Sequence, residues 1–268
     1  MHDVELAKRF DADVVARYGT IFSEALSAKV TAHGEAREIL DLACGTGYGL
    51  LRLLPAVSFH ARITALDDDR FRLNCLHAKL TPDSRRRVFI QKHSGPRLPF
   101  AADTFDVVYG AFPLGAPANP RRFLQQALRV LRDNAWLYLA VPLENSFVEL
   151  THALSDGLRA DNRKKELERA LAARGPMLSP AEWTTYLERV GAINGDCSEH
   201  QFDIDLQTPF SADRLFTAHL IHLWFGDAPR ETADIFARLA ETVKTATLRL
   251  GIIAAQRGAL PIEEGTSA

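Results

Sequence analysis

The stretch Glu38–Gly47, which reads EILDLACGTG, decides the fold of this chain. Its first half is an apolar run of strand length, and its second half is a turn that contains Gly45 and Gly47. Glycine permits a tight turn and lets the backbone pass close to a ligand. The segment Tyr48–Leu54 then has apolar residues at helical spacing. The stretch therefore predicts a strand, a glycine turn and a helix, which is where an open α/β sheet binds nucleotide-like ligands.

The same alternation continues through the first half of the chain. Short apolar runs are separated by segments of helical periodicity, and this pattern predicts βαβ units with a parallel sheet that is buried on both faces. The expected strands are Glu38–Ala43, Ala61–Leu66, Arg87–Gln91, Phe105–Tyr109 and Trp136–Val141, and the expected helices between them are Tyr48–Leu54, Arg70–Leu80 and Pro120–Leu131.

The flanking segments are mostly helical in pattern. Val4–Val30 has apolar residues at helical spacing on both sides of Gly19, and Ser179–Val190 opens with a Ser-Pro-x-Glu helix start. Residues 193–206 predict either a strand pair or one long strand, and Ala246–Ala255 predicts a last strand.

Composition limits the possible partners and compartment. The 268 residues carry a formal net charge of -2, which gives no electrostatic footprint for nucleic acid or for an anionic membrane. No leader-like or membrane-spanning apolar stretch is found. Cys44, Cys75 and Cys197 lie far apart, without metal-ligand spacing. We therefore expect a cytoplasmic protein with no bound metal, no membrane partner and no nucleic-acid partner.

An acidic residue follows the glycine turn at the spacing that is typical of a ribose-binding carboxylate. Asp67 ends the next apolar run, about 20 residues beyond Gly47, where a carboxylate can accept both ribose hydroxyls of an adenosine. Dinucleotide-binding sheets share this arrangement, but their glycines follow Gly-x-Gly-x-x-Gly, and the glycines here are spaced differently. A nicotinamide-dependent oxidoreductase is therefore a disfavoured alternative.

Four motifs together resemble class I S-adenosylmethionine (SAM)-dependent methyltransferases of the small-molecule, type 11-like group. The resemblance spans about residues 38–141, and Ala43 stands where that family usually has glycine. At the turn before the fifth strand, Asn134 and Ala135 replace a usual Gly-Gly pair, and Asn tolerates the left-handed backbone that such a turn needs. The matching segments are Asp41–Gly47, Ala65–Asp67, Leu98–Val108 and Arg129–Ala135.

The resemblance implies SAM as the cofactor and assigns roles to individual residues. Asp41 would hold the loop or meet the methionine amino group, and Asp67, with Asp68 beside it, would bind the ribose. Ser94, followed by Gly95, stands where many relatives have an Asp that holds the adenine amino group. The glycine-turn residues that would pass beside the methionine are Ala43, Gly45 and Gly47. The residues that would face the sulfonium are Gly110, Ala111 and Phe112. Tyr18 would lie in a lid helix over the cofactor.

The implied architecture is an α/β, Rossmann-like fold with a mostly parallel seven-stranded sheet, helices on both faces and a helical cap. The expected units are lid helices (1–34), a SAM-binding α/β core (35–142), cap helices (143–178), a core continuation (179–206), further cap helices (207–247), a final strand (248–257) and a tail (258–268).

The predicted function is methyl transfer to an oxygen or nitrogen of a small or carrier-tethered organic acceptor. His219 and His222 lie one turn apart on an expected helix and are the candidate bases, although packing residues are an alternative interpretation. The segment Ser146–Leu150 and a late helix (210–216) faintly resemble the malonyl-carrier-protein methyltransferases of biotin synthesis. A non-catalytic SAM-binding scaffold or partner subunit is the main rival function.

Overall fold

The computed structural model describes residues 11, 15, 19–113, 117–160, 163, 165, 168, 177–205 and 243–258. The predicted sites Tyr18, His219 and His222 lie outside the described residues, as do part of the N-terminal lid segment and most of the second cap segment. None of the helices in the described part of the chain is long and apolar enough to cross a membrane.

The described strands form one seven-stranded sheet in the order β3-β2-β1-β4-β5-β7-β6. Five strands run parallel, and β7 pairs antiparallel with both β5 and β6. This topology confirms the predicted Rossmann-like, mostly parallel seven-stranded sheet. The strands are β1 Glu38–Asp41, β2 Arg62–Asp67, β3 Val88–Lys92, β4 Phe105–Ala111, β5 Leu131–Pro142, β6 Ala192–Asp205 and β7 Thr245–Arg257.

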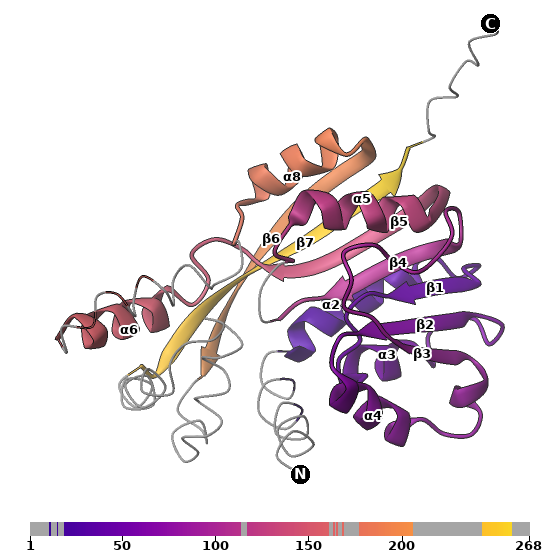
Figure 1. Cartoon of the computed structure of the whole chain (residues 1–268), viewed down its shortest axis with the longest axis horizontal. Coiled ribbons are helices and arrows are strands. Elements are labelled where there is room, and N and C mark those ends of the chain that lie inside the picture. The colour runs from indigo at the N-terminus through magenta and orange to yellow at the C-terminus, as the bar shows by residue number, and fades with distance from the viewer. Residues whose placement is uncertain are drawn as a thin grey trace, which may run out of the picture.

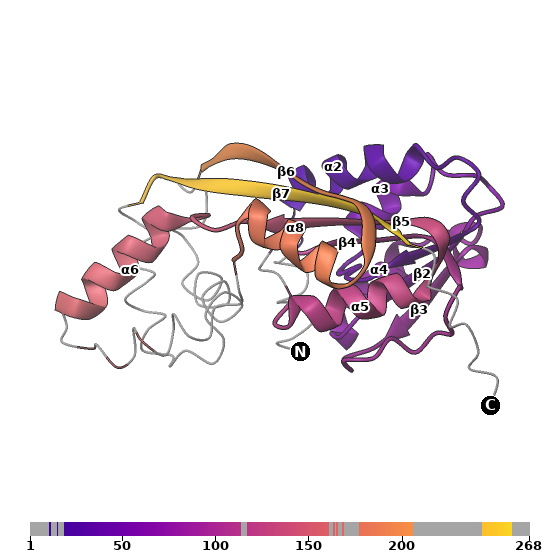
Figure 2. The same cartoon turned by 90° about the horizontal axis from the view of Figure 1, so that it is seen from above.

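Helices cover both faces of the sheet, as the doubly apolar strands require. Figure 2 shows α2 and α3 on one side of the sheet and α5 and α8 on the other. Consecutive residues of β1 serve the two faces, because Ile39 packs in the core under α2 and α3 and Leu40 packs in the core under α5 and α8. The described helices are α2 Thr20–Thr31, α3 Tyr48–Leu53, α4 Arg70–Lys79, α5 Pro120–Val130, α6 Val148–Ala160 and α8 Pro180–Arg189, with the short 3-10 helix η2 at Ser84–Arg86.

The helix start predicted at Ser179 is confirmed in full. The Ser179 hydroxyl accepts from the Glu182 backbone N–H, and the Glu182 carboxylate accepts from the Ser179 backbone N–H, so a capping box opens α8. Trp183 on this helix is fully buried against the sheet.

The structure corrects one predicted boundary and decides one alternative that the sequence leaves open. The turn expected over Arg129–Ala135 is taken into β5, which begins at Leu131. Asn134 does have the left-handed φ of 61°. The pairing of β4 with β5 shifts register there, so the irregular residues form a bulge inside a continuous strand. A strand pair and one long strand were both open for residues 193–206, and the described part of that range, 193–205, belongs to the single strand β6.

β6 and β7 run together past the ends of the parallel strands toward α6 (Figure 1). The start of α6 is fastened to β7 by two polar side chains. The Glu149 carboxylate accepts from the hydroxyl and the backbone N–H of Thr247, and the Ser146 hydroxyl bonds the backbone of Arg249. The segment Ser146–Leu150, singled out in the sequence, therefore joins α6 to the sheet.

Candidate functional site

A cavity of about 680 Å³ opens where the parallel strands β1, β2 and β4 end. Their last residues, Asp41, Asp67 and Ala111, all line it, because carboxyl ends of parallel strands meet at one edge of a sheet. The volume is in the range of small-molecule and cofactor pockets. The α2 helix supplies one wall through Ser23, Leu26 and neighbouring residues.

A buried pair of acid and phenol lies at the base of the cavity. Strand register places Asp41 beside Tyr109 across β1 and β4. The Tyr109 hydroxyl donates to Oδ2 of Asp41 at 2.8 Å, and the Ala43 N–H donates to Oδ1 at 3.3 Å. Both side chains are buried. Burial raises the pKa of Asp41 to about 7, against the lowering effect of the Tyr109 and Ala43 hydrogen bonds, and it raises the pKa of Tyr109 well above its usual value.

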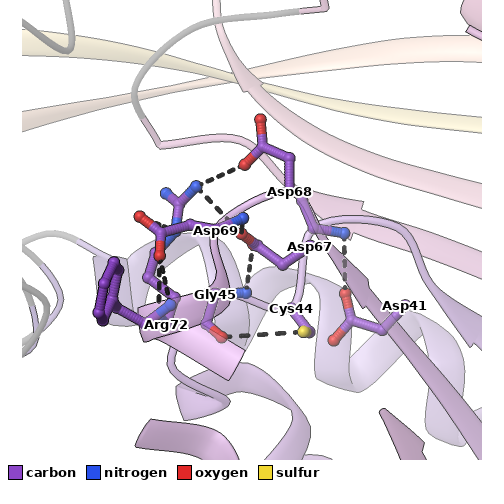
Figure 3. A network of polar contacts seen from close by, with 9 residues as sticks. Asp41, Cys44, Gly45, Asp67, Asp68, Asp69 and Arg72 are labelled. Carbon is purple, nitrogen blue, oxygen red and sulfur yellow. Dashed lines mark hydrogen bonds and ion pairs between the residues drawn. The ribbon is translucent and has the colours of Figure 1, made fainter. Parts of the chain in front are cut away.

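Asp67 is held by several partners at the end of β2. Its Oδ2 accepts from the Gly45 N–H at 2.9 Å, and its Oδ1 accepts from the Asp69 N–H at 2.9 Å. Arg72 reaches back from α4 to Oδ1 of Asp67 at 3.0 Å and to Oδ1 of Asp68 at 2.8 Å. Figure 3 shows the Arg72 side chain beside these acids and the Gly45 N–H directed at Asp67. Burial raises the pKa of Asp67, and the Arg72 charge opposes that rise.

The glycine turn is shaped by backbone that only glycine adopts freely. Gly45 and Gly47 have φ of 53° and 86°. A Cβ at Gly47 would collide with the side chain of Leu76 on α4, so this glycine lets α4 pack closely behind the loop. Cys44, buried in the same turn, has a pKa raised well above its usual value by burial, and so it is no reactive thiolate.

The opposite wall is formed by the segments that follow β3 and β4. His93, Ser94 and Gly95 line the cavity after β3, and Phe112 lines it after β4. The Phe112 ring packs edge-on against Phe123 of α5, with ring centroids 5.4 Å apart. The Nε2 atom of His93 is buried and has no hydrogen-bond partner among the described residues.

Most of the predicted cofactor residues line this one cavity: Asp41, Ala43, Gly45, Asp67, Asp68, Ser94, Gly95, Ala111 and Phe112. Gly47 is not part of the lining and lies behind the turn. Sequence reasoning missed Tyr109, Arg72 and His93. Tyr109 ends an apolar run and resembles a core residue, and only its alignment with Asp41 across two strands could have revealed the pair.

No group of three or more His, Cys, Asp or Glu residues that could hold a metal ion occurs in the described part of the chain. The acidic side chains at the cavity are instead bonded to backbone N–H groups, to Tyr109 and to Arg72.

Residues 39–134 match the family described as methyltransferase domain. A curated relative, the demethylmenaquinone methyltransferase of Lactococcus lactis, is 30% identical over 94 residues, which are 35% of this chain and 37% of that protein. The chain thus matches only about a third of the length of this relative.

Solved structures share the whole fold. The YcgJ protein of Bacillus subtilis is 16% identical with a TM-score of 0.58, and the alignment covers 87% of this chain and 97% of that one. A SAM-dependent methyltransferase from Aquifex aeolicus is 17% identical with a TM-score of 0.52, covering 94% of this chain and 98% of that one. Domain match and topology together confirm the resemblance seen in the sequence: the chain carries a methyltransferase domain and has the fold of the class I SAM-dependent methyltransferases.

Proposed function

We propose that this chain transfers the methyl group of SAM to an oxygen or nitrogen of a small or carrier-tethered organic acceptor. The observation that carries the proposal is the single cavity at the strand ends, in which the glycine turn, Asp67 and the end of β4 come together. These are the features that the methyltransferase domain match covers, since residues 39–134 contain all of them.

The lining fits SAM part by part. Asp67 is a buried carboxylate at the end of β2, suited to the ribose hydroxyls, with Asp68 beside it. Ser94 and Gly95 offer polar groups to the adenine edge. Asp41 offers a negative charge to the methionine end of the cofactor, next to the turn at Gly45.

The cofactor supplies a sulfonium-activated methyl group, so the protein has to orient the acceptor and exclude water. Ala111 and Phe112 follow β4 at the cavity wall and are the proposed neighbours of the reacting centre. Apolar side chains such as Leu26, Val30 and Phe123 make up much of the cavity lining, which favours a small organic acceptor over nucleic acid.

His219 and His222 remain the proposed general bases for an acceptor that is protonated at neutral pH. Glutamine at either position keeps similar bulk and cannot take a proton at neutral pH. A base predicts a turnover loss of about 100-fold with unchanged SAM affinity. A lowered melting temperature with near-normal turnover would instead show that the histidine is a packing residue.

The acceptor can be found by incubating the protein with methyl-labelled SAM and metabolite extracts, followed by untargeted mass spectrometry. A labelled product that depends on the protein supports the proposal. The Asp67→Ala variant should abolish the label at limiting SAM. The matched control Asp83→Ala changes an exposed aspartate outside the cavity and should retain it.

The rival functions give different binding results. Calorimetry with SAM, S-adenosylhomocysteine and NAD identifies an oxidoreductase, because an oxidoreductase binds NAD. The labelling experiment identifies a scaffold, which binds SAM without forming any labelled product. The features that support a scaffold are the departures from the family pattern at Ala43, Ser94 and Asn134–Ala135. Binding of NAD in preference to SAM would refute the proposed function.

A further inference from the structure

Acidic side chains outnumber basic ones around Asp41, where the strands end at the cavity. Asp41, Asp67 and Asp68 all line it, and Arg72 is the cation nearest to these acids. Arg72 is already bound to Asp67 and Asp68. Among the residues that the structure describes, no cation forms an ion pair with Asp41, although its side chain is only 3% exposed. A buried carboxylate without a counter-charge is costly, so the site is suited to a ligand that brings a positive charge.

Among the described residues, the other groups around Asp41 do not supply a positive charge that would compensate it. From β2, Asp67 adds a second negative charge, and from the turn Cys44 is a neutral thiol. The wall from α2 contributes Ser23, Leu26, Ser27 and Val30, which carry no charge. On the α4 side, Lys79 bonds the carbonyl oxygen of Thr46 and pairs with Asp11, so its charge is neutralised locally.

Tyr109 is the neighbour that donates a side-chain hydrogen bond to Asp41. Its phenol, 4% exposed, donates to Oδ2, while among the described residues Oδ1 has only the longer hydrogen bond from the Ala43 N–H. A hydrogen bond to the charged form of a carboxyl stabilises that form. Tyr109 therefore both orients the carboxylate and opposes the effect of its burial.

We propose that Tyr109 is a positioning residue that holds Asp41 as the counter-charge for a cationic group of the cofactor, so that cofactor binding releases the proton of Asp41. This inference rests on the proposed function for the identity of the cofactor. Its cationic groups are the α-ammonium and the sulfonium, and S-adenosylhomocysteine carries the ammonium alone.

The raised pKa of Asp41, about 7, gives the direction of the pH dependence. Below that pH the free protein carries the proton, and binding of a cation must expel it. Affinity should therefore fall as the pH drops through about 7, by up to tenfold per unit. Without the Tyr109 hydroxyl, the pKa of Asp41 would lie higher still, and the loss of affinity would begin at a higher pH.

Proton release can be measured directly by titration calorimetry with SAM and with S-adenosylhomocysteine, in buffers of different ionisation enthalpy from about pH 6 to 9. We expect release near pH 6 that fades above about pH 8 in the unmodified protein. Asp41→Asn should abolish the proton release that comes from Asp41. Any release that remains in this variant can then be assigned to other groups such as Asp67.

Tyr109→Phe should move the release to higher pH and lower the affinity about tenfold at pH 7, and the loss of affinity should shrink as the pH rises towards about 8. Tyr138→Phe is the matched control, because Tyr138 is a buried tyrosine of β5 that bonds His33 and lies outside the cavity. It should leave the release curve unchanged. Release with both ligands identifies the ammonium as the partner of Asp41, and release with SAM alone identifies the sulfonium; either supports the proposal.

Equal loss of affinity at every pH in Tyr109→Phe would show a merely structural role and would overturn the inference. Proton release that persists unchanged in Asp41→Asn would also overturn the inference. This second test does not depend on whether the Tyr109→Phe variant folds. The proposed function fails separately, if cofactor binds with the expected proton release and yet no methylated product forms with any extract.

Discussion

Replacing Asp41 by asparagine should stabilise the ligand-free protein at neutral and alkaline pH. The side chain is fully buried, and its pKa is raised from 3.8 to about 7. Asparagine has the size of the carboxyl group, and its amide oxygen can still accept the Tyr109 hydrogen bond. The substitution therefore removes the cost of burying a negative charge and keeps the Tyr109 hydrogen bond, although the longer hydrogen bond from the Ala43 N–H is lost.

The magnitude follows from the pKa. Between about pH 4 and 7 the folded state binds the Asp41 proton more tightly than the unfolded state does, so the stability of the natural protein falls as the pH rises through this window. The shift is about 3 pH units, and each unit corresponds to 1.36 kcal/mol, which gives a cost of about 4 kcal/mol when the carboxylate is fully ionised. Below about pH 4 the carboxyl is neutral in both states and the cost vanishes.

Urea unfolding of both proteins without cofactor, from about pH 4 to 9, tests this directly. The two free energies of unfolding should be close near pH 4, and the variant should become more stable by about 2 to 4 kcal/mol by pH 8. Asp83→Asn, at an exposed position, should show no such divergence. A variant that is less stable than the natural protein at pH 8, or a difference that does not depend on pH, would refute the reasoning.

Three further predictions concern the site and its support. Asp67→Ala should weaken SAM binding by about 1.5 to 3 kcal/mol in a titration, because hydrogen bonds to a charged group are lost, and unchanged affinity would place the ribose acid elsewhere. Ser94→Asp should tighten SAM binding or leave it unchanged, and a tenfold loss would mean that the adenine edge is read differently. Arg257→Leu should lower the free energy of unfolding by about 1 to 3 kcal/mol in urea, because the Leu131 carbonyl oxygen loses the hydrogen bond from this buried arginine; an unaffected midpoint would contradict that role.

The fold could be predicted because its signals are local. Glycine at 45 and 47, an apolar run ending in Asp67, and a capping sequence at Ser179 each act within a few residues, and each has the expected conformation. Sequence pattern could not decide whether residues 193–206 turn back or continue, because both forms alternate in the same way. The choice depends on pairing with β7, which lies about 50 residues further along the chain.

The site was predictable where a motif marks it and not where contacts cross the sheet. Asp41 and Asp67 stand at fixed positions in their motifs, and both line the cavity. Tyr109 is 68 residues from Asp41, and a tyrosine that ends a buried strand has the same sequence pattern whether its hydroxyl meets an acid or a neighbouring backbone group. Arg72 on α4 resembles an exposed helix residue until the end of β2 is placed beside it.

The position of β7 has a consequence for synthesis on the ribosome. This strand is the last of the seven to emerge, yet it lies between β5 and β6 in the finished sheet. In the described sheet β6 has β7 as its only neighbour, so β6 has to wait without a partner after it leaves the exit tunnel. Meanwhile the nascent chain, although it already contains β1 to β5 and the glycine turn, presents the open edge of β5 to other chains. A ribosome that stalls before Thr245 would thus release a chain that has the residues of the cavity but remains prone to aggregate. Pairing of β7 with β5 and β6 removes the open edge of β5 and so ends this exposure.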